Sequence, residues 1–184
     1  MKKYFPILTF LMVFFVFLGA QVSFDLVRFK KPESRVIQYQ SYQDVFSKVS
    51  FRTVDNKKII LSKVRSPLII LNFWASWCAP CLKELPSLIR LRKRFRSEDL
   101  LVIGINTDEE KQLEKILKTQ DEFGINFPIV ADSLGEALSE FQVNAIPLTI
   151  FYYKGKVIDI SYGAKEFDSP MMIEKLENLL GQSS

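Results

Sequence analysis

The pattern of apolar and polar residues divides this chain of 184 residues into three parts. An uncharged, mostly apolar run from Tyr4 to Phe24 comes first, and a polar stretch without sustained periodicity, Asp25 to Val45, follows it. From Phe46 onward, apolar runs of strand length alternate with stretches in which apolar residues recur at helical spacing. This alternation, followed by a hairpin and a last helix, predicts an α/β domain with a mixed sheet and helices on both faces.

Turn residues and periodicity place the individual elements. Two short alternating runs separated by Asp55-Asn56 predict a hairpin. The near-continuous apolar run from Leu68 to Phe73 suits a strand that is covered on both faces. The other expected strands are 100–105, 127–130, 148–153 and 156–161, and helices are expected from Ala79, over 109–119 and 134–141, and after Ser169-Pro170.

The N-terminal run has the length of a membrane span. At about 1.5 Å per residue, a helix of this length reaches roughly 30 Å, the thickness of the hydrocarbon core of a bilayer. The two lysines before it favour a cytoplasmic N-terminus and an exported domain. A cleaved signal peptide, cut after Leu18-Gly19-Ala20, is the alternative, but the run is long for one. We expect a signal anchor over 1–24, a juxtamembrane linker over 25–45 and the domain over 46–184.

The two cysteines of the chain stand in Cys78-Ala79-Pro80-Cys81, where the apolar strand meets a helical pattern. This spacing is typical of redox sites, because unpaired N–H groups and the helix dipole favour a thiolate at the first cysteine. A zinc site is a weaker interpretation, since the chain has no third cysteine and no histidine. A structural disulfide is also weaker, because closing so short a loop restrains the unfolded chain little.

Composition narrows the possible chemistry. With 48% hydrophobic residues and a net charge of +4, the chain has enough apolar residues for a substantial core and too little positive charge for an obligate nucleic-acid binder. Without histidine there is no Cys–His pair and no histidine base. A basic cluster near the end of the helix after Cys81 predicts a solvated face, with docking of an acidic partner as the alternative. Its members are Arg90, Arg92, Lys93, Arg94 and Arg96.

The segment N-F-W-A-S-W-C-A-P-C-L-K-E-L-P, residues 72–86, resembles the active-site segment of the thioredoxin superfamily. The resemblance is closest to the membrane-anchored TlpA, ResA and CcmG branch and covers most of the chain from about Phe46. It implies a thioredoxin fold with an N-terminal hairpin and a helix–strand insertion. It also implies a thiol–disulfide oxidoreductase without cofactor or metal, on the periplasmic side of a bacterial cytoplasmic membrane and attached by a single span.

The resemblance also implies roles for individual residues. Cys78 is expected to attack a partner disulfide, and Cys81 is expected to resolve the mixed disulfide, which leaves a Cys78–Cys81 disulfide. Pro147 is expected to be cis and to face the cysteines, with the backbone of Ile146 pairing with the substrate. The residues expected to shape the substrate groove are Trp74, Trp77, Ala79, Pro80, Ile146 and Pro147.

Two polar residues near the cysteines are of special interest. Asn72 stands where many cytoplasmic thioredoxins have a buried aspartate, and since it cannot ionise we expect a hydrogen-bonded core amide. Glu84 matches the glutamate of the ResA-like motif C-x-x-C-x-x-E. One helical turn after Cys81, it could disfavour a second negative charge and transfer a proton as the disulfide opens. The alternative is an ordinary surface glutamate near a helix N-terminus.

The resemblance favours reduction of partner disulfides as the function. The expected partners are protein thiols or disulfides such as apocytochrome c, with a membrane thiol transporter as the source of electrons. A disulfide-forming oxidase would use the same residues. A thioredoxin-like peroxidase needs a threonine and an arginine near its cysteine, where this chain has Ser76 and Trp77. A non-catalytic binding module does not need the two cysteines, and a copper chaperone of the Sco type needs a histidine.

Overall fold

The computed structural model describes residues 12–18, 21 and 31–181. The chain forms two compact units, Met1–Gln40 and Ser41–Ser184. In the first unit residues 12–18 are helical and exposed, whereas most of the predicted anchor and the first part of the predicted linker lie outside the described residues. Among the residues that are described, no helix is both long and apolar enough to cross a bilayer.

Part of the expected linker is helical. Helix α2 spans Lys31–Lys48, and the second unit begins at Ser41 rather than at Phe46. The end of α2 belongs to the domain because Tyr42 and Phe46, four residues apart on one helix face, are both buried. The Phe46 ring lies 4.7 Å from the Tyr152 ring, and the Tyr152 hydroxyl donates a hydrogen bond to the Tyr42 carbonyl. Two aromatic residues in a polar stretch were too weak a pattern to predict this helix.

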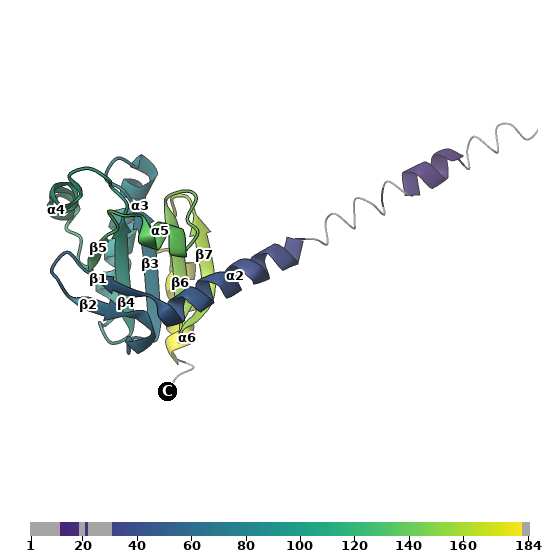
Figure 1. Ribbon diagram of the computed structural model, residues 1–184. Coiled ribbons are helices and arrows are strands. Elements are labelled where there is room, and N and C mark those ends of the chain that lie inside the picture. The colour runs from purple at the N-terminus through teal and green to yellow at the C-terminus, as the bar shows by residue number, and fades with distance from the viewer. Residues whose placement is uncertain (1–11, 19–20, 22–30, 182–184) are drawn as a thin grey trace, which may run out of the picture. The chain divides into compact units, whose positions relative to one another are not determined.

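The domain is built on a five-stranded mixed sheet (Figure 1) in the order β5-β4-β3-β6-β7. Strands β3, β4 and β5 run parallel, and β6 is antiparallel to β3 and β7. A separate antiparallel hairpin precedes the sheet and confirms the predicted turn at Asp55-Asn56. The strands are β1 (Ser50–Arg52), β2 (Lys58–Ile60), β3 (Leu68–Trp74), β4 (Leu100–Asn106), β5 (Ile129–Ala131), β6 (Leu148–Tyr153) and β7 (Lys156–Tyr162).

Helices complete the predicted alternation. The four that follow β3 are α3 (Ala79–Arg94), α4 (Gln112–Phe123), α5 (Glu136–Glu140) and α6 (Pro170–Gly181), and a short 3-10 helix covers Leu61–Lys63. The expected insertion is present as α4 and β5 between β4 and β6. Helix α4 begins three residues later than expected, and its C-cap is Gly124, whose φ of 66° suits glycine.

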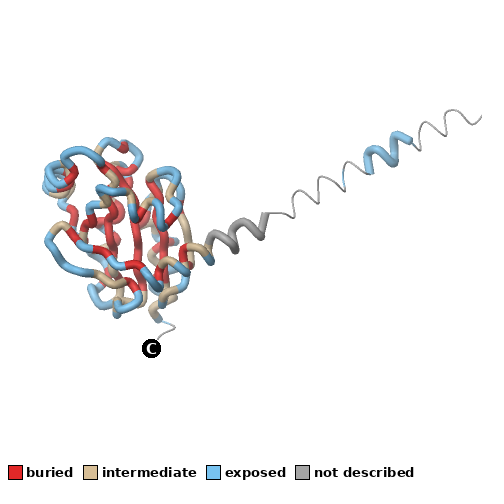
Figure 2. Tube along the Cα trace, in the orientation of Figure 1, coloured by how far each residue is buried: buried red, intermediate tan, exposed pale blue. Residues whose placement is uncertain are grey.

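Both faces of the sheet are covered, as Figure 2 shows by the buried colouring along the central strands. All seven residues of β3 are buried, which confirms the prediction for its apolar run. Because side chains alternate along a strand, Leu68, Ile70 and Trp74 join α3 and α6 in one core. On the other face Phe73 packs against Phe141, which also contacts Phe51 of the hairpin.

Three of the five members of the basic cluster after Cys81 are paired with carboxylates. Arg90 pairs with Glu166 and Asp168, and Arg94 pairs with Glu177. Arg96 pairs with two acidic residues in the loop after α3. These exposed pairs support the interpretation of the cluster as a solvated face.

Candidate active site

The two cysteines lie at the start of α3 and are joined by a disulfide. Cys78 is the N-cap residue of the helix, and its Sγ accepts a hydrogen bond of 3.3 Å from the backbone N–H of Cys81. Cys78 is 4% exposed and Cys81 is fully buried. The Cys81 N–H in the first turn of the helix therefore points at the first sulfur, a position that favours a thiolate once the disulfide is reduced.

The loop that leads to Cys78 is held in place by a buried carboxylate. Asp108, fully buried just after β4, accepts hydrogen bonds from the backbone N–H and the hydroxyl of Ser76, at 3.0 and 2.9 Å. Its second support is the side-chain amide of Asn106, which donates to it at 2.8 Å. The sequence pattern assigns Asp108 no role, because this residue stands just before the expected helix start at 109. Its place at the carboxyl end of β4 is the signal that points to the cysteine loop.

Glu84 is buried beneath the cysteines, with 2% of its surface exposed. Asn72 on β3 donates a 2.6 Å hydrogen bond from Nδ2 to Glu84 Oε1, and a second one of 2.9 Å to the Thr149 hydroxyl on β6. The expectation of a hydrogen-bonded core amide at Asn72 is therefore confirmed. Thr149 lies opposite Asn72 in the β3–β6 register, and no sequence pattern had assigned it to the site.

Burial raises the pKa of Glu84 from 4.5 to about 7, and the hydrogen bonds from Asn72 and from the Lys165 backbone N–H oppose this rise in part. The Lys165 N–H donates to Oε2 at 3.3 Å. A pocket of about 200 Å³ opens on this side of the carboxyl group, and its other walls are Lys83, Ala164, Lys165 and Glu166. Glu84 is therefore a buried acid that can change protonation near neutral pH, not an ordinary surface glutamate.

The expected cis peptide bond between Ile146 and Pro147 is present. The residue after it, Leu148, pairs with Phe73, so Pro147 adjoins the end of β3, where the cysteine loop begins. Ile146 packs against the core cluster that contains both cysteines. Tyr162 pairs with Leu148 from the other side and is 58% exposed, which adds an aromatic surface that the sequence pattern had not marked.

Of the other expected groove residues, Trp77, Ala79 and Pro80 are exposed around Cys78. Trp77 is 68% exposed. Trp74 differs from the expectation, because it is fully buried and cannot contact a substrate directly. The alternation along β3 directs its side chain into the core, where its Nε1 lies against Gly104. It supports the cysteine loop from beneath.

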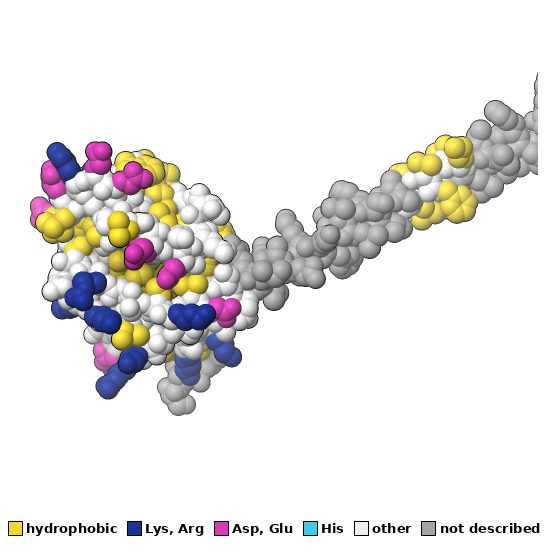
Figure 3. Space-filling view, viewed as in Figure 1, with side chains coloured by type: hydrophobic (Ala, Val, Ile, Leu, Met, Phe, Trp, Pro, Cys, Tyr) yellow, Lys and Arg dark blue, Asp and Glu magenta, His cyan; other side chains and the backbone are white. Residues whose placement is uncertain are grey.

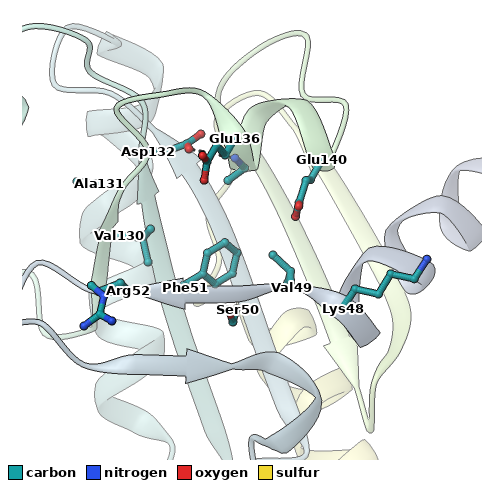
Figure 4. Close-up of a pocket in the computed structure, with 11 residues that line it drawn as sticks. Lys48, Val49, Ser50, Phe51, Arg52, Val130, Ala131, Asp132, Glu136 and Glu140 are labelled. Atoms are coloured by element: carbon teal, nitrogen blue, oxygen red, sulfur yellow. Dashed lines mark hydrogen bonds between the residues drawn. The ribbon is translucent and has the colours of Figure 1, made fainter.

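A second hollow, of about 380 Å³, lies away from the cysteines between the hairpin and α5 (Figure 4). Val49, Phe51 and Val130 form its apolar part, and Glu136 and Glu140 extend toward it from α5. It contains none of the predicted site residues. Across the described ranges, no group of three or more histidine, cysteine, aspartate or glutamate side chains is arranged to hold a metal ion.

The mixed sheet, the Cys-X-X-Cys at the start of α3 and the cis-proline beside it define a thioredoxin-like thiol–disulfide oxidoreductase. Residues 43–160 match the family described as the AhpC/TSA family, and the chain belongs to that thioredoxin-like family.

Relatives with known names agree with this class. The chain is 31% identical over 128 residues to the thiol-disulfide oxidoreductase ResA of Bacillus subtilis, which covers 68% of each chain. It is 33% identical over 116 residues to the thioredoxin-like protein YneN of the same organism, covering 62% of this chain and 67% of YneN. Among solved structures, StoA from Bacillus subtilis superimposes with a TM-score of 0.58 and 25% identity, over 72% of this chain and 95% of StoA. A thiol-disulfide isomerase from Corynebacterium glutamicum shares the fold, with a TM-score of 0.61 and 18% identity over 74% and 97% of the two chains.

Proposed function

We propose that this thiol–disulfide oxidoreductase reduces disulfides of partner proteins outside the cytoplasm, while its N-terminal apolar run holds it in the cytoplasmic membrane. The observation that carries the reductive direction is the buried Glu84 one helical turn after Cys81. A carboxylate there disfavours a thiolate nearby, and the chain has no histidine to compensate. Strong oxidants of this class owe their potential to a stabilised reduced form. A nearby carboxylate offsets part of the stabilisation that the helix N-terminus gives the Cys78 thiolate, which makes the pair a better reductant.

The reaction begins with the Cys78 thiolate. It attacks one sulfur of the partner disulfide, forms a mixed disulfide and releases the other partner sulfur as a thiolate. Cys81 then loses its proton and attacks Cys78 Sγ, which forms the Cys78–Cys81 disulfide and releases the second partner thiolate. Two electrons pass from the protein to the partner. One of the two protons that the partner thiols take up comes from Cys81, and the other comes from solvent.

Glu84 accepts the proton of Cys81 in this proposal. A base must be ionised to accept a proton, and a carboxyl group with a pKa of about 7 is poised between its two states at neutral pH. Asn72, which also donates to the Thr149 hydroxyl, holds the carboxyl group in place without adding a charge. The catalytic residues are therefore Cys78, Cys81 and Glu84.

The substrate groove consists of the exposed Trp77, Ala79 and Pro80 on one side and of Ile146 and Pro147 on the other. The backbone of Ile146 pairs with an extended segment of the partner, as the resemblance to the ResA branch implies. We propose apocytochrome c as a substrate and a membrane thiol transporter as the source of electrons. Both follow from that resemblance.

Two measurements on the full chain in detergent test this function. The first is reduction of insulin disulfides by the wild type and by the Cys78→Ser and Cys81→Ser variants. We expect activity only in the wild type and a trapped mixed disulfide only in Cys81→Ser. No activity in the wild type would contradict the enzymatic function, and rapid turnover of hydrogen peroxide would favour the peroxidase alternative.

The second measurement is the reduction potential of the Cys78–Cys81 pair together with its redox state in cells. We expect a potential closer to that of thioredoxin, about −270 mV, than to that of DsbA, about −120 mV. A potential near the DsbA value with a mostly oxidised pair in cells would reverse the proposed direction to that of an oxidase.

A further inference from the structure

The ends of the strands meet at two opposite edges of the central sheet, and different side chains lie at these two edges. The cysteines lie beyond the carboxyl end of β3, at one edge. At the opposite edge, the turn between β6 and β7 meets the segment before β3, where the Lys154 N–H donates a 2.7 Å hydrogen bond to the Pro67 carbonyl. The start of the domain reaches the same edge, because Phe46 packs against Gly155 of that turn.

Five exposed basic side chains stand on the segments that meet at this edge, and we call them the basic edge. They are Lys48, Lys63, Arg65, Lys154 and Lys156. Neighbouring backbone contacts tie these segments together, since the Leu61 N–H donates to the Val49 carbonyl between Lys48 and Lys63. The Lys154 ammonium group lies 5.2 Å from the centre of the Tyr153 ring.

None of these five residues forms an ion pair with a carboxylate of the described residues. Seven other basic residues of the domain do, and the remaining unpaired ones, Lys111 and Lys118 among them, lie on other segments. The paired ones are Lys57, Arg90, Arg94, Arg96, Lys115, Lys165 and Lys175. The acidic residues of the loop before β4, Glu98 and Asp99, are already paired with Arg96. The basic edge therefore keeps an uncompensated positive charge. Figure 3 shows the lower part of the domain with mostly lysine and arginine and the upper part with mostly aspartate and glutamate.

We propose that the basic edge rests on the anionic phospholipid headgroups of the membrane, so that the edge with the cysteines faces away from the bilayer. This inference rests on the proposed membrane attachment through the N-terminal run. The attraction of a basic residue to an anionic membrane surface favours the bound state roughly fivefold per residue and weakens within a Debye length. Several such residues on one edge are enough to orient a domain that is already tethered.

The short segment between the apolar run and the domain favours a membrane surface as the partner. Sixteen residues separate Phe24, the end of the apolar run, from Ser41, where the domain begins. Even fully extended, they reach at most about 55 Å, which keeps the domain at high effective concentration near the lipid. The first exposed basic residue after the domain's buried Phe46 is Lys48, a member of the basic edge. The exposed Trp77 at the far edge then stays open to protein substrates.

Lysine acetylation under single-hit conditions tests the orientation on the full chain. The chain is placed in nanodiscs of neutral phosphatidylcholine or of phosphatidylcholine with one third phosphatidylglycerol. On the anionic discs at low salt, we expect the acetylation rates of Lys63, Lys154 and Lys156 to fall at least threefold and to recover in high salt. Lys111 and Lys118 are the internal controls, since they are exposed at or after the start of α4, and their rates should stay unchanged.

A pair of matched variants completes the test. Reversing two charges of the basic edge, with Lys154→Glu and Lys156→Glu, should return the rate at Lys63 to its value on neutral discs. The control variant, Lys111→Glu with Lys118→Glu, should keep Lys63 protected. Co-elution of the chain with the discs reports on the anchor alone, so a chain that stays outside the discs would contradict the attachment. A chain that co-elutes but is acetylated equally on both lipids would overturn the basic edge as a lipid-facing surface.

Discussion

Replacing Glu84 by glutamine is expected to stabilise the oxidised protein at neutral and alkaline pH. The substitution keeps the shape of the side chain and removes its ability to ionise. Asn72 can adapt, because its Oδ1 has no hydrogen-bond partner among the described residues, so a rotated amide could accept from the new NH₂ group. The loss of packing and hydrogen bonding should therefore be small, about 1 kcal/mol or less.

The magnitude follows from the pKa of the carboxyl group. In the folded protein it is raised to about 7, from 4.5 for the same group in water. Below pH 4.5 the group is protonated in both states, and between the two pKa values only the folded state keeps the proton, so stability falls as the pH rises. Each tenfold change in a proton-binding constant is worth about 1.4 kcal/mol, which makes the full loss about 3 kcal/mol once the pH exceeds the folded-state pKa.

Urea unfolding of both proteins at several pH values from 5 to 8, with the disulfide intact, measures this contribution. Across that range, the free energy of unfolding of the wild type should fall by about 2 to 3 kcal/mol more than that of Glu84→Gln. The variant should be the more stable protein at pH 8. Holding the disulfide intact removes any contribution from cysteine ionisation. Two parallel pH profiles would refute the conclusion that Glu84 is an acid with a raised pKa.

Three further substitutions test the surroundings of the cysteines. Asp108→Ala removes the acceptor that holds the cysteine loop, and we expect a loss of about 2 to 4 kcal/mol in urea unfolding and a fall of about tenfold in the rate of insulin reduction. Asn72→Asp places a second carboxyl group within hydrogen-bonding distance of Glu84, so one proton is held more tightly and the midpoint of the pH–rate profile should rise above 7. Gly104→Ala brings a methyl group to 2.9 Å from Trp74 Nε1, and this overpacking should cost about 1 to 3 kcal/mol in chemical denaturation.

The order of the elements could be predicted from the sequence because their periods are strong. The apolar run that forms β3 is long enough to be buried on both faces, and the spacing of leucines on α3 is regular. The elements that were misplaced depend on contacts between distant segments. Helix α2 is held by Phe46, which packs on Tyr152 of β6, and by Tyr42, which stacks on Phe141. The start of α4 follows a loop in which Asp108 bonds Ser76 of the cysteine loop.

The active site shows the same contrast between local sequence signals and contacts of distant segments. The two cysteines and the cis-proline can be recognised from short stretches of sequence. The burial of a side chain, in contrast, depends on segments that are distant in the sequence. Trp74 and Trp77 are three residues apart in one conspicuous motif, yet one is fully buried and the other is 68% exposed, because the strand ends between them. A motif therefore identifies the chemistry of the site, but only the register of the sheet decides which of its side chains can meet a substrate.

The same register explains how Asn72 on β3 and Glu84 on α3 come to share a hydrogen bond. Asn72 lies on the face of β3 that α3 covers, and directly opposite Thr149 of β6. Thr149 is two residues beyond Pro147, so a single short strand joins the groove to the hydrogen bonds around Glu84. The bond from Asn72 holds the Glu84 carboxyl group in the core, and the second carboxyl oxygen lies beside the backbone of Lys165. The position of the charge thus follows from which face of β3 the helix covers.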